Sequence, residues 1–176
     1  ERLPGSYAIG HNRYSTAGGA VLRNIQPFFA DLSSGPISIA HNGNLTNGIS
    51  LREKLVQNGS IFQSTSDTEI IIQLIAVSKR TNFIDKLIDA LFQIQGGFSL
   101  VVMTGKKLIG VRDPFGIRPL VLGDLDGSPI LTSETCTLDI IGAKFIREIE
   151  NGEIVVITKD GIKSIKPFPK VNCRPD

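Results

Sequence analysis

The sequence predicts an α+β fold built mainly from antiparallel β-sheet. β-prone segments lie near the start of the chain and throughout its second half, whereas the segment between them has apolar residues at helical spacing. Asx-Gly pairs separate several of the later β-prone runs, and such pairs favour tight turns between antiparallel strands. Strands, a block of helices and a long meander therefore describe one α+β domain.

The first half of the chain predicts two strands and three helices. Each helical segment ends or begins with a recognisable signal: Gly59 stops the first, Ser66-x-x-Glu69 opens the second as a capping box, and Gly96-Gly97 stops the third. The predicted strands are residues 7–16 and 37–42, and the predicted helices are residues 50–59, 64–80 and 82–95.

From Phe98 onward the pattern is that of a meander, interrupted by one short helix at residues 134–141. We expect hairpin turns at Asp126-Gly127, Asn151-Gly152 and Asp160-Gly161. The predicted strands are 98–104, 107–113, 119–124, 129–133, 144–150, 153–158 and 161–166. The chain has no linker and no internal repeat, so we expect residues 1–176 to form one domain. Because the chain starts at Glu1, we expect a piece truncated at both ends.

Composition excludes several classes of protein. With 41% hydrophobic and 20% charged residues and a net charge of +2, the 176 residues are typical of a soluble globular domain that binds neither nucleic acid nor membrane. Cys136 and Cys173 form no CxxC motif, and His11 lies thirty residues before His41, so no zinc pattern is present. A reducing compartment, and hence the cytoplasm, is the expected location.

The segment SIAHNGNLTNG, residues 38–48, allows two interpretations of Asn42-Gly43. Asn-Gly favours a hairpin, but the residues that follow change to helical spacing instead of forming a second strand. Alternatively, an Asn side-chain amide beside an unhindered Gly N–H at a strand end supplies two donors directed at one point, as in an oxyanion hole. This segment alone leaves both the turn and the oxyanion hole open.

Two further segments contain candidate binding residues. In GHNRYSTAG, residues 10–18, Arg13 is either a surface or structural charge or a clamp for a carboxylate, with Thr16 as a nearby hydroxyl. In the first helical turn after Ser66, Asp67 is either a favourable charge at the helix dipole or the partner of a substrate ammonium. An Arg, an Asp and an oxyanion hole together suit an amino acid with a side-chain amide.

An ordered set of motifs resembles one family over nearly the whole chain, from about Tyr7 to Val156. The motifs are GHNRYSTAGG, QPF, AHNGNLTN, GSIFQSTSDTE, RDPFGIRPL and SETCTLD. Together they resemble the glutaminase domain of the amidophosphoribosyltransferase family, which belongs to the class II glutamine amidotransferases. RDPFGIRPL by itself also resembles asparagine synthetase, so the order of the whole set carries the assignment.

The resemblance implies a fold and a site. The family fold is a four-layer α/β/β/α sandwich of the N-terminal-nucleophile hydrolase type, with two mainly antiparallel sheets. By motif, Arg13 with Thr16 would bind the α-carboxylate of L-glutamine, and Asn42 and Gly43 would form the oxyanion hole. Asp67, with Ser66 before it, would bind the α-ammonium, although STSDTE departs slightly from the family's SSDTE.

The resemblance also implies a reaction. An N-terminal Cys attacks the glutamine amide, and the released ammonia reaches a phosphoribosyltransferase domain, which transfers it to phosphoribosyl pyrophosphate to give 5-phosphoribosylamine for purine synthesis. No Cys stands at position 1, and no phosphoribosyltransferase motif is present, so we expect this piece alone to be inactive. Cys136, inside a predicted helix, is expected to be a small buried packing residue and not the nucleophile.

The implied cofactors and partners lie mostly outside this chain. We expect no cofactor in this piece and Mg²⁺ in the absent phosphoribosyltransferase domain. An iron–sulfur cluster is an option in the full-length protein, which we expect to be a homo-oligomer. Within RDPFGIRPL we expect a rigid turn with locally paired charges from Arg112, Asp113 and Arg118 in a supporting role. His11 and His41 are expected to be structural hydrogen-bonding residues.

Two other functions remain alternatives. One is a different class II amidotransferase, of the glucosamine-6-phosphate synthase or asparagine synthetase type, which the downstream domain would distinguish. The other is a nucleophile-free pseudo-amidotransferase domain that acts in binding or regulation. The latter predicts that the gene itself encodes no upstream Cys.

Overall fold

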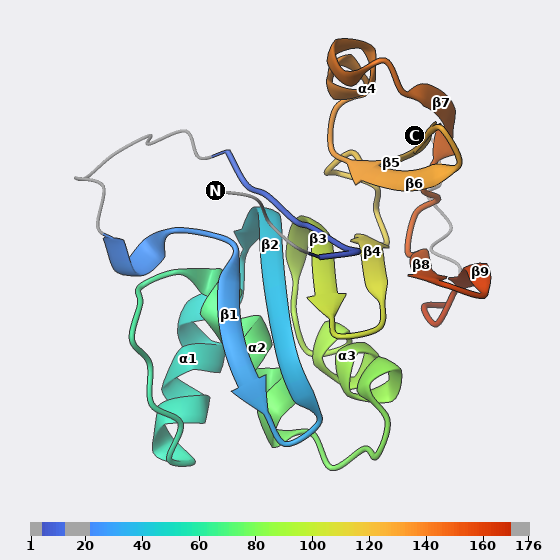
Figure 1. Ribbon diagram of the computed structural model, residues 1–176. Helices are drawn as coiled ribbons and strands as arrows, with labels where there is room; N and C mark the ends of the chain where they lie inside the picture. The colour runs from blue at the N-terminus through green and yellow to red at the C-terminus, as the bar shows by residue number, and fades with distance from the viewer. Residues whose placement is uncertain (1–4, 13–21, 170–176) are drawn as a thin grey trace, which may run out of the picture.

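A computed structural model describes residues 5–12 and 22–169 (Figure 1). Six strands form an antiparallel sheet in the order β1 (Phe28–Leu32), β2 (Gly35–Leu45), β3 (Gly96–Thr104), β4 (Leu108–Arg112), β8 (Ile154–Thr158) and β9 (Gly161–Ile165). Three more form a second sheet in the order β6 (Ser128–Thr132), β5 (Val121–Leu125) and β7 (Lys144–Glu148). The helices are α1 (Gly48–Gln57), α2 (Asp67–Val77), α3 (Phe83–Leu91) and α4 (Thr135–Ile141), after a 3₁₀ turn η1 (Leu22–Asn24).

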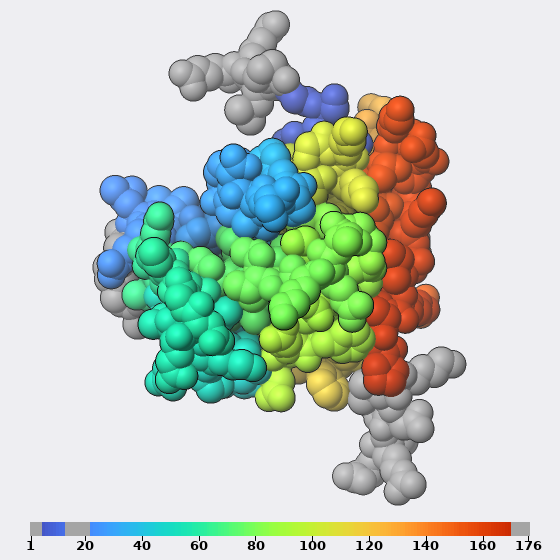
Figure 2. Space-filling view, turned by 90° about the horizontal axis from the view of Figure 1, so that it is seen from below, coloured from blue at the N-terminus to red at the C-terminus, as the bar shows by residue number. Residues whose placement is uncertain are grey.

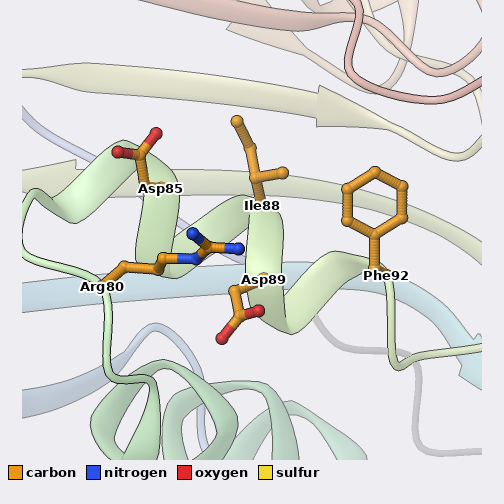
Figure 3. Close-up of a pocket in the computed structure, with 5 residues that line it drawn as sticks. All are labelled: Arg80, Asp85, Ile88, Asp89 and Phe92. Carbon is orange, nitrogen blue, oxygen red and sulfur yellow. The ribbon is translucent and has the colours of Figure 1, made fainter.

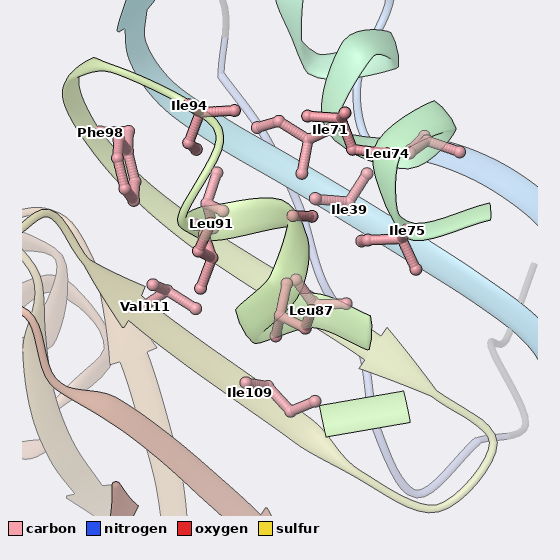
Figure 4. Close-up of a cluster of buried hydrophobic side chains, with 14 of the residues drawn as sticks. Ile39, Ile71, Leu74, Ile75, Leu87, Leu91, Ile94, Phe98, Ile109 and Val111 are labelled. Carbon is pink, nitrogen blue, oxygen red and sulfur yellow. The ribbon is translucent and has the colours of Figure 1, made fainter. Parts of the chain in front are cut away.

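The main core lies between the six-stranded sheet and the helices α1 to α3. Figure 4 shows Ile71, Ile75 and Leu87 of these helices directed toward Ile39 and Ile109 of the sheet, and all five side chains are fully buried. In Figure 2 the teal and green residues of α1 to α3 pack together, beside the red edge formed by β8 and β9. Burial of this apolar surface is the principal stabilising contribution to the layer.

A second core separates the two sheets. Leu108 and Val155 of the six-stranded sheet pack with Leu122 of the three-stranded sheet. The next residue, Gly123, faces the opposite way, because a Cβ there would meet the side chain of Leu138 on α4. Since neighbouring strand residues point to opposite faces, α4 covers the outer face of the small sheet. The order helices, sheet, sheet, helix confirms the predicted α+β four-layer fold.

The predicted first strand is wrong where the structure describes it. Residues 7–12 belong to no strand, and residues 13–16 lie outside the described ranges. Tyr7 and Ile9 pack against the core between the two sheets. The alternation of apolar residues along this segment therefore reflects burial of one of its sides and not pairing with another strand. The second predicted strand, 37–42, lies within the longer β2.

Two of the three predicted hairpins are confirmed. Asp126-Gly127 joins β5 to β6, and Asp160-Gly161 joins β8 to β9. The prediction at Asn151-Gly152 is wrong, because β7 belongs to the small sheet and β8 to the large one. Gly152, which has a positive φ of 70°, therefore lies in a connection between the two sheets and not in a hairpin.

The capping box predicted at the start of α2 is only partly present. Ser66 caps α2 by accepting a hydrogen bond from the Thr68 N–H, as predicted, but Glu69 does not complete the capping box. Its buried carboxylate instead accepts from the backbone N–H groups of Gln63 and Ser64, at 2.8 and 2.7 Å. These bonds hold the loop before α2 in place. The capping-box pattern does not include this loop, so it predicted the wrong hydrogen-bond partner for the Glu69 carboxylate.

The third helix also ends differently from the prediction. It stops at Leu91, so Gly96-Gly97 is not its stop but the beginning of β3, where Gly96 pairs with Leu45. The intervening turn is held by the Asn47 side chain, which donates to the Gln93 carbonyl and accepts from the Gln95 N–H. A distant side chain thus fixes the turn that follows the helix, where the sequence pattern predicted a glycine stop.

One carboxylate links the two sheets. Glu153, in the crossing between β7 and β8, has a side chain that is 1% exposed. It accepts two hydrogen bonds from Arg147 on β7, at 2.7 and 2.8 Å, and one from Ser164 on β9 at 2.7 Å. Burial alone would raise the pKa of Glu153, but these bonds and that from the Glu150 N–H lower it to about 2.

This site predicts an acid-sensitive contribution to stability. Because the pKa of Glu153 is about 2 in the folded chain against an ordinary 4.5, its stabilising contribution is complete above pH 4.5 and is lost as the pH falls toward 2. Glu153→Gln should lower the free energy of unfolding at neutral pH and flatten its decline below pH 4.5. Urea unfolding at a series of pH values measures both effects.

The matched control is Glu148→Gln, which removes a carboxylate that also faces an arginine, Arg112, but is 70% exposed. Exposed pairs contribute little, so this variant should retain the wild-type pH dependence. Equal pH profiles for Glu153→Gln and the wild type would contradict the assignment.

Candidate functional site

Asn42 and Gly43 lie inside β2, and the turn interpretation of this pair is therefore wrong. Asn42 is opposite Ser99 and Gly43 is opposite Phe98 in the ladder with β3. The chain turns only later, where Asn47 precedes the first residue of α1. The site begins on a strand paired along one edge, which holds its backbone in a fixed direction.

The other edge of β2 is open at Gly43. β1 pairs with β2 only as far as Ile39, and among the described residues no strand continues beyond it. On this edge the His41 N–H donates to the Gln26 side chain at 2.7 Å, and the Leu45 N–H donates to Asp67 at 2.9 Å. Alternate residues of a strand present their N–H groups to the same edge, so the Gly43 N–H points outward between these two amides.

The register supports this direction. Opposite Gly43, the Phe98 carbonyl accepts from the Asp113 N–H at 2.9 Å, and the Phe98 N–H donates to the Asp113 carboxylate at 3.3 Å. Phe98 thus directs both backbone groups away from β2, which makes its pairing with Gly43 a non-hydrogen-bonded one. Gly43 itself is exposed, so its N–H is available to a ligand.

No other residue fits at position 43. The backbone φ is +148°, which L side chains rarely adopt, and a Cβ would overlap the Gly97 carbonyl oxygen and lie 2.8 Å from the Phe98 Cα. The glycine is therefore required both by the conformation and by the close approach of β3.

Asp67 lies at the first position of α2 and is bound to residues on both sides of the Asn-Gly pair. Its Oδ2 accepts from the Leu45 N–H, and its Oδ1 lies 3.4 Å from His41 Nδ1. Burial raises the pKa of Asp67, but the contacts with His41 and the backbone N–H groups outweigh burial and lower it. The side chain is 24% exposed and stays ionised at neutral pH, so it can accept a bond from an ammonium.

Ser66 and the histidines support this arrangement. The Ser66 hydroxyl donates to Thr68 Oγ1 at 3.1 Å, and Thr68 Oγ1 lies 3.3 Å from the buried His41 Nδ1. His11 Nε2 lies 3.2 Å from the His41 carbonyl oxygen. These contacts agree with the structural role expected of His11 and His41, and they place Ser66 at the helix cap.

The two remaining predicted binding residues, Arg13 and Thr16, lie outside the described residues. Within the described ranges, the structure brings Asn42, Gly43 and Asp67 together at the open edge of β2. The nearest described part of the same motif is His11, which contacts the same strand.

The segment RDPFGIRPL has a greater role than sequence reasoning gave it. The fully buried Asp113 does not pair with a neighbouring arginine: its carboxylate accepts from the N–H groups of Phe98, Phe115, Ile117 and Arg118. The Arg118 guanidinium instead donates to Asn42 Oδ1. An Asp followed by Pro and Gly signals such a backbone-binding turn, but no local signal gives the contact with Asn42.

Elsewhere the described residues offer little that resembles a site. A shallow pocket on α3, lined by Arg80, Asp85, Ile88, Asp89 and Phe92, contains none of the predicted residues (Figure 3). No group of three or more His, Cys, Asp or Glu side chains within residues 5–12 and 22–169 could hold a metal ion. In the same ranges no helix has the length and apolar character required to cross a membrane.

Comparison with known proteins finds relatives that match nearly the whole chain. The chain is 55% identical to an amidophosphoribosyltransferase of Rhizobium etli over 98% of its own length and 36% of that protein. It is 51% identical to amidophosphoribosyltransferase 1, chloroplastic, of Arabidopsis thaliana, over 97% of its length and 30% of that protein. The chain thus spans about a third of these curated relatives.

Solved structures give the same result. Glutamine phosphoribosylpyrophosphate amidotransferase from B. subtilis, complexed with ADP and GMP, matches 89% of this chain and 34% of its own, with a TM-score of 0.83 and 37% identity. A structure described as the allosteric regulatory enzyme of purine biosynthesis matches with a TM-score of 0.86 and 39% identity over the same shares.

The two sheets between helical layers, together with the match to these two amidotransferase structures, define a domain of the N-terminal-nucleophile hydrolase type. The sequence profile of the glutamine amidotransferase domain matches residues 11–139. The chain belongs to this glutamine amidotransferase family.

Proposed function

We propose that this chain is the glutaminase part of an amidophosphoribosyltransferase. In the whole enzyme, this part hydrolyses glutamine to glutamate and ammonia, and the ammonia is transferred to phosphoribosyl pyrophosphate to give 5-phosphoribosylamine, the first step of purine biosynthesis. The observation that carries the glutaminase assignment is the outward N–H of the exposed Gly43, beside the Asn42 carboxamide and between two amides that are already bonded. The names of the relatives support the acceptor.

Substrate binding in this proposal uses opposite charges at the two ends of glutamine. The ionised Asp67, held by the Leu45 N–H and His41, accepts from the α-ammonium. Arg13, by its position in the motif, clamps the α-carboxylate, with Thr16 beside it. The side-chain amide then extends along the open edge of β2.

The chemistry is acyl transfer. A thiolate attacks the glutamine amide carbon, and the negative charge moves to the carbonyl oxygen, which accepts from the Gly43 N–H and the Asn42 carboxamide. The carbon–nitrogen bond then breaks, the leaving nitrogen takes a proton as ammonia, and water hydrolyses the resulting thioester to glutamate. Asn42 and Gly43 lower the barrier because they bind the charge that develops.

The nucleophile in this proposal is the N-terminal Cys implied by the family resemblance, whose α-amine takes up the thiol proton. Cys136 is exposed on α4, so the prediction that it is a buried packing residue is wrong. It does not serve as the nucleophile, because α4 covers the outer face of the three-stranded sheet, whereas Asn42 lies in the six-stranded sheet. Cys173 lies outside the described residues.

The remaining features of the whole enzyme are proposals of the same kind. Mg²⁺ would act with phosphoribosyl pyrophosphate on the phosphoribosyltransferase domain, and nothing in the described residues fits a metal or an iron–sulfur cluster. A homo-oligomer in the cytoplasm completes the proposal, although the Arabidopsis relative is named chloroplastic. Sedimentation and cell fractionation test these two points.

Glutamine binding tests the site directly. In the protein as its gene encodes it, glutamine should raise the melting temperature, and Asp67→Asn and Arg13→Ala should each remove that rise. Asp139→Asn, a substitution at an exposed position on α4, is the matched control and should keep it. If glutamine still protected both site variants, the substrate assignment would be wrong.

A further inference from the structure

Arg118 contacts the candidate oxyanion hole through Asn42. Its Nε lies 3.1 Å from Asn42 Oδ1, and its Nη2 donates to the same oxygen. A guanidinium has only donors, so it can face the oxygen of the carboxamide but not the nitrogen. The Asn42 NH₂ group is therefore turned away from Arg118.

Hydrogen bonds at its N–H and at its carbonyl fix the backbone of Arg118. Its N–H donates to the buried carboxylate of Asp113 at 3.0 Å, and its carbonyl accepts from Arg112 Nε at 3.1 Å. Asp113 also bonds the Phe98 N–H opposite Gly43, so the same carboxylate connects the Arg118 loop to the strand behind the site. The guanidinium thus approaches Asn42 from a rigid support.

Within residues 5–12 and 22–169, the charge of Arg118 is not used in an ion pair. Among the described residues no carboxylate lies within ion-pair distance of it, and the adjacent Asp113 binds backbone N–H groups instead. An arginine kept only for structure would gain more from a carboxylate than from a neutral amide oxygen. The contact with Asn42 accounts for a half-buried arginine that has no such partner in the part of the chain that the structure describes.

We propose that Arg118 is a positioning residue that orients the Asn42 carboxamide for catalysis. By holding Oδ1, it presents the NH₂ group to the developing oxyanion and prevents a rotation of the amide that would present an acceptor there. This inference rests on the proposed function, in which Asn42 donates to the oxyanion. Its consequence is a defect in the transition state and not in glutamine binding.

A double-mutant cycle tests this coupling in the protein as its gene encodes it. Arg118→Met should lower kcat for glutamine hydrolysis by about tenfold or more, less than the loss expected for Asn42→Ala, with an unchanged KM. The variant with both substitutions should be no slower than Asn42→Ala alone, because Arg118 acts only through that side chain. Arg80→Gln removes an exposed arginine and should leave kcat unchanged.

Two further measurements separate positioning from folding. Arg118→Lys keeps the charge but loses the planar fork, so it should recover only part of the rate. Guanidinium ion added at low concentration should raise kcat of Arg118→Ala and have no such effect on Asn42→Ala. A general folding defect would appear as a lowered melting temperature and would not respond to guanidinium.

The possible outcomes distinguish the two proposals. A normal kcat in Asn42→Ala would overturn the oxyanion-hole assignment itself. A slow Asn42→Ala together with a normal Arg118→Met would overturn only the role of Arg118. Losses that multiply in the double variant, or a failure of guanidinium to rescue the rate, would also show that Arg118 does not act through Asn42.

Discussion

Asn42→Ala is expected to reduce kcat for glutamine hydrolysis by about 100- to 1000-fold, which corresponds to roughly 3–4 kcal/mol of transition-state stabilisation. The Asn42 amide donates to a charge that exists only after the nucleophile attacks, so the KM for glutamine should change little. Steady-state glutamate release measures both constants.

The matched control is Asn44→Ala, which truncates an exposed asparagine two residues further along β2. It should keep the wild-type kcat. A large rise in KM in Asn42→Ala, with kcat preserved, would contradict the oxyanion role and would indicate instead that Asn42 binds the ground-state substrate.

Gly43→Ala is expected to cost about 4 kcal/mol of folding free energy and to remove activity, because strain at a disfavoured φ and overpacking against β3 add together. The added methyl would overlap the Gly97 carbonyl oxygen, which belongs to a strand in the middle of the sheet. Movement of β2 away from β3 would also displace Asn42. Chemical denaturation gives the stability, and glutamate release gives the activity.

Gly105→Ala provides the control for this substitution, since a Cβ at Gly105 meets no atom within 4 Å and its φ is not in the disfavoured positive range. It should be close to neutral. Wild-type stability in Gly43→Ala would show that the close approach of β2 and β3 is not as described.

The sequence predicted those parts of the fold that depend on local periodicity. The helical spacing of Ile70 to Ile75 and the Asp-Gly hairpins were sufficient because each signal and its partner lie close together in the chain. The crossing at Asn151-Gly152 was mispredicted because its pattern is that of a hairpin, while the two strands belong to different sheets. Only tertiary packing decides between these alternatives.

The site shows the same division. Asn42, Gly43 and Asp67 could be proposed because the motif resemblance and the chemistry of each side chain pointed to the same role. Arg118 could not be assigned, because it follows Asn42 by 76 positions and contacts it only after the Asp113 turn has formed. Glu69 was misassigned for a related reason: a capping-box pattern does not reveal that loop amides compete for its carboxylate.

We propose that this domain hydrolyses glutamine to supply ammonia for transfer to phosphoribosyl pyrophosphate. The most direct test measures glutamate release from glutamine by the protein as its gene encodes it, with and without phosphoribosyl pyrophosphate. We expect hydrolysis that phosphoribosyl pyrophosphate stimulates. Hydrolysis indifferent to that sugar would contradict the acceptor and indicate another class II amidotransferase, whereas the absence of hydrolysis in a verified intact protein would contradict the glutaminase itself.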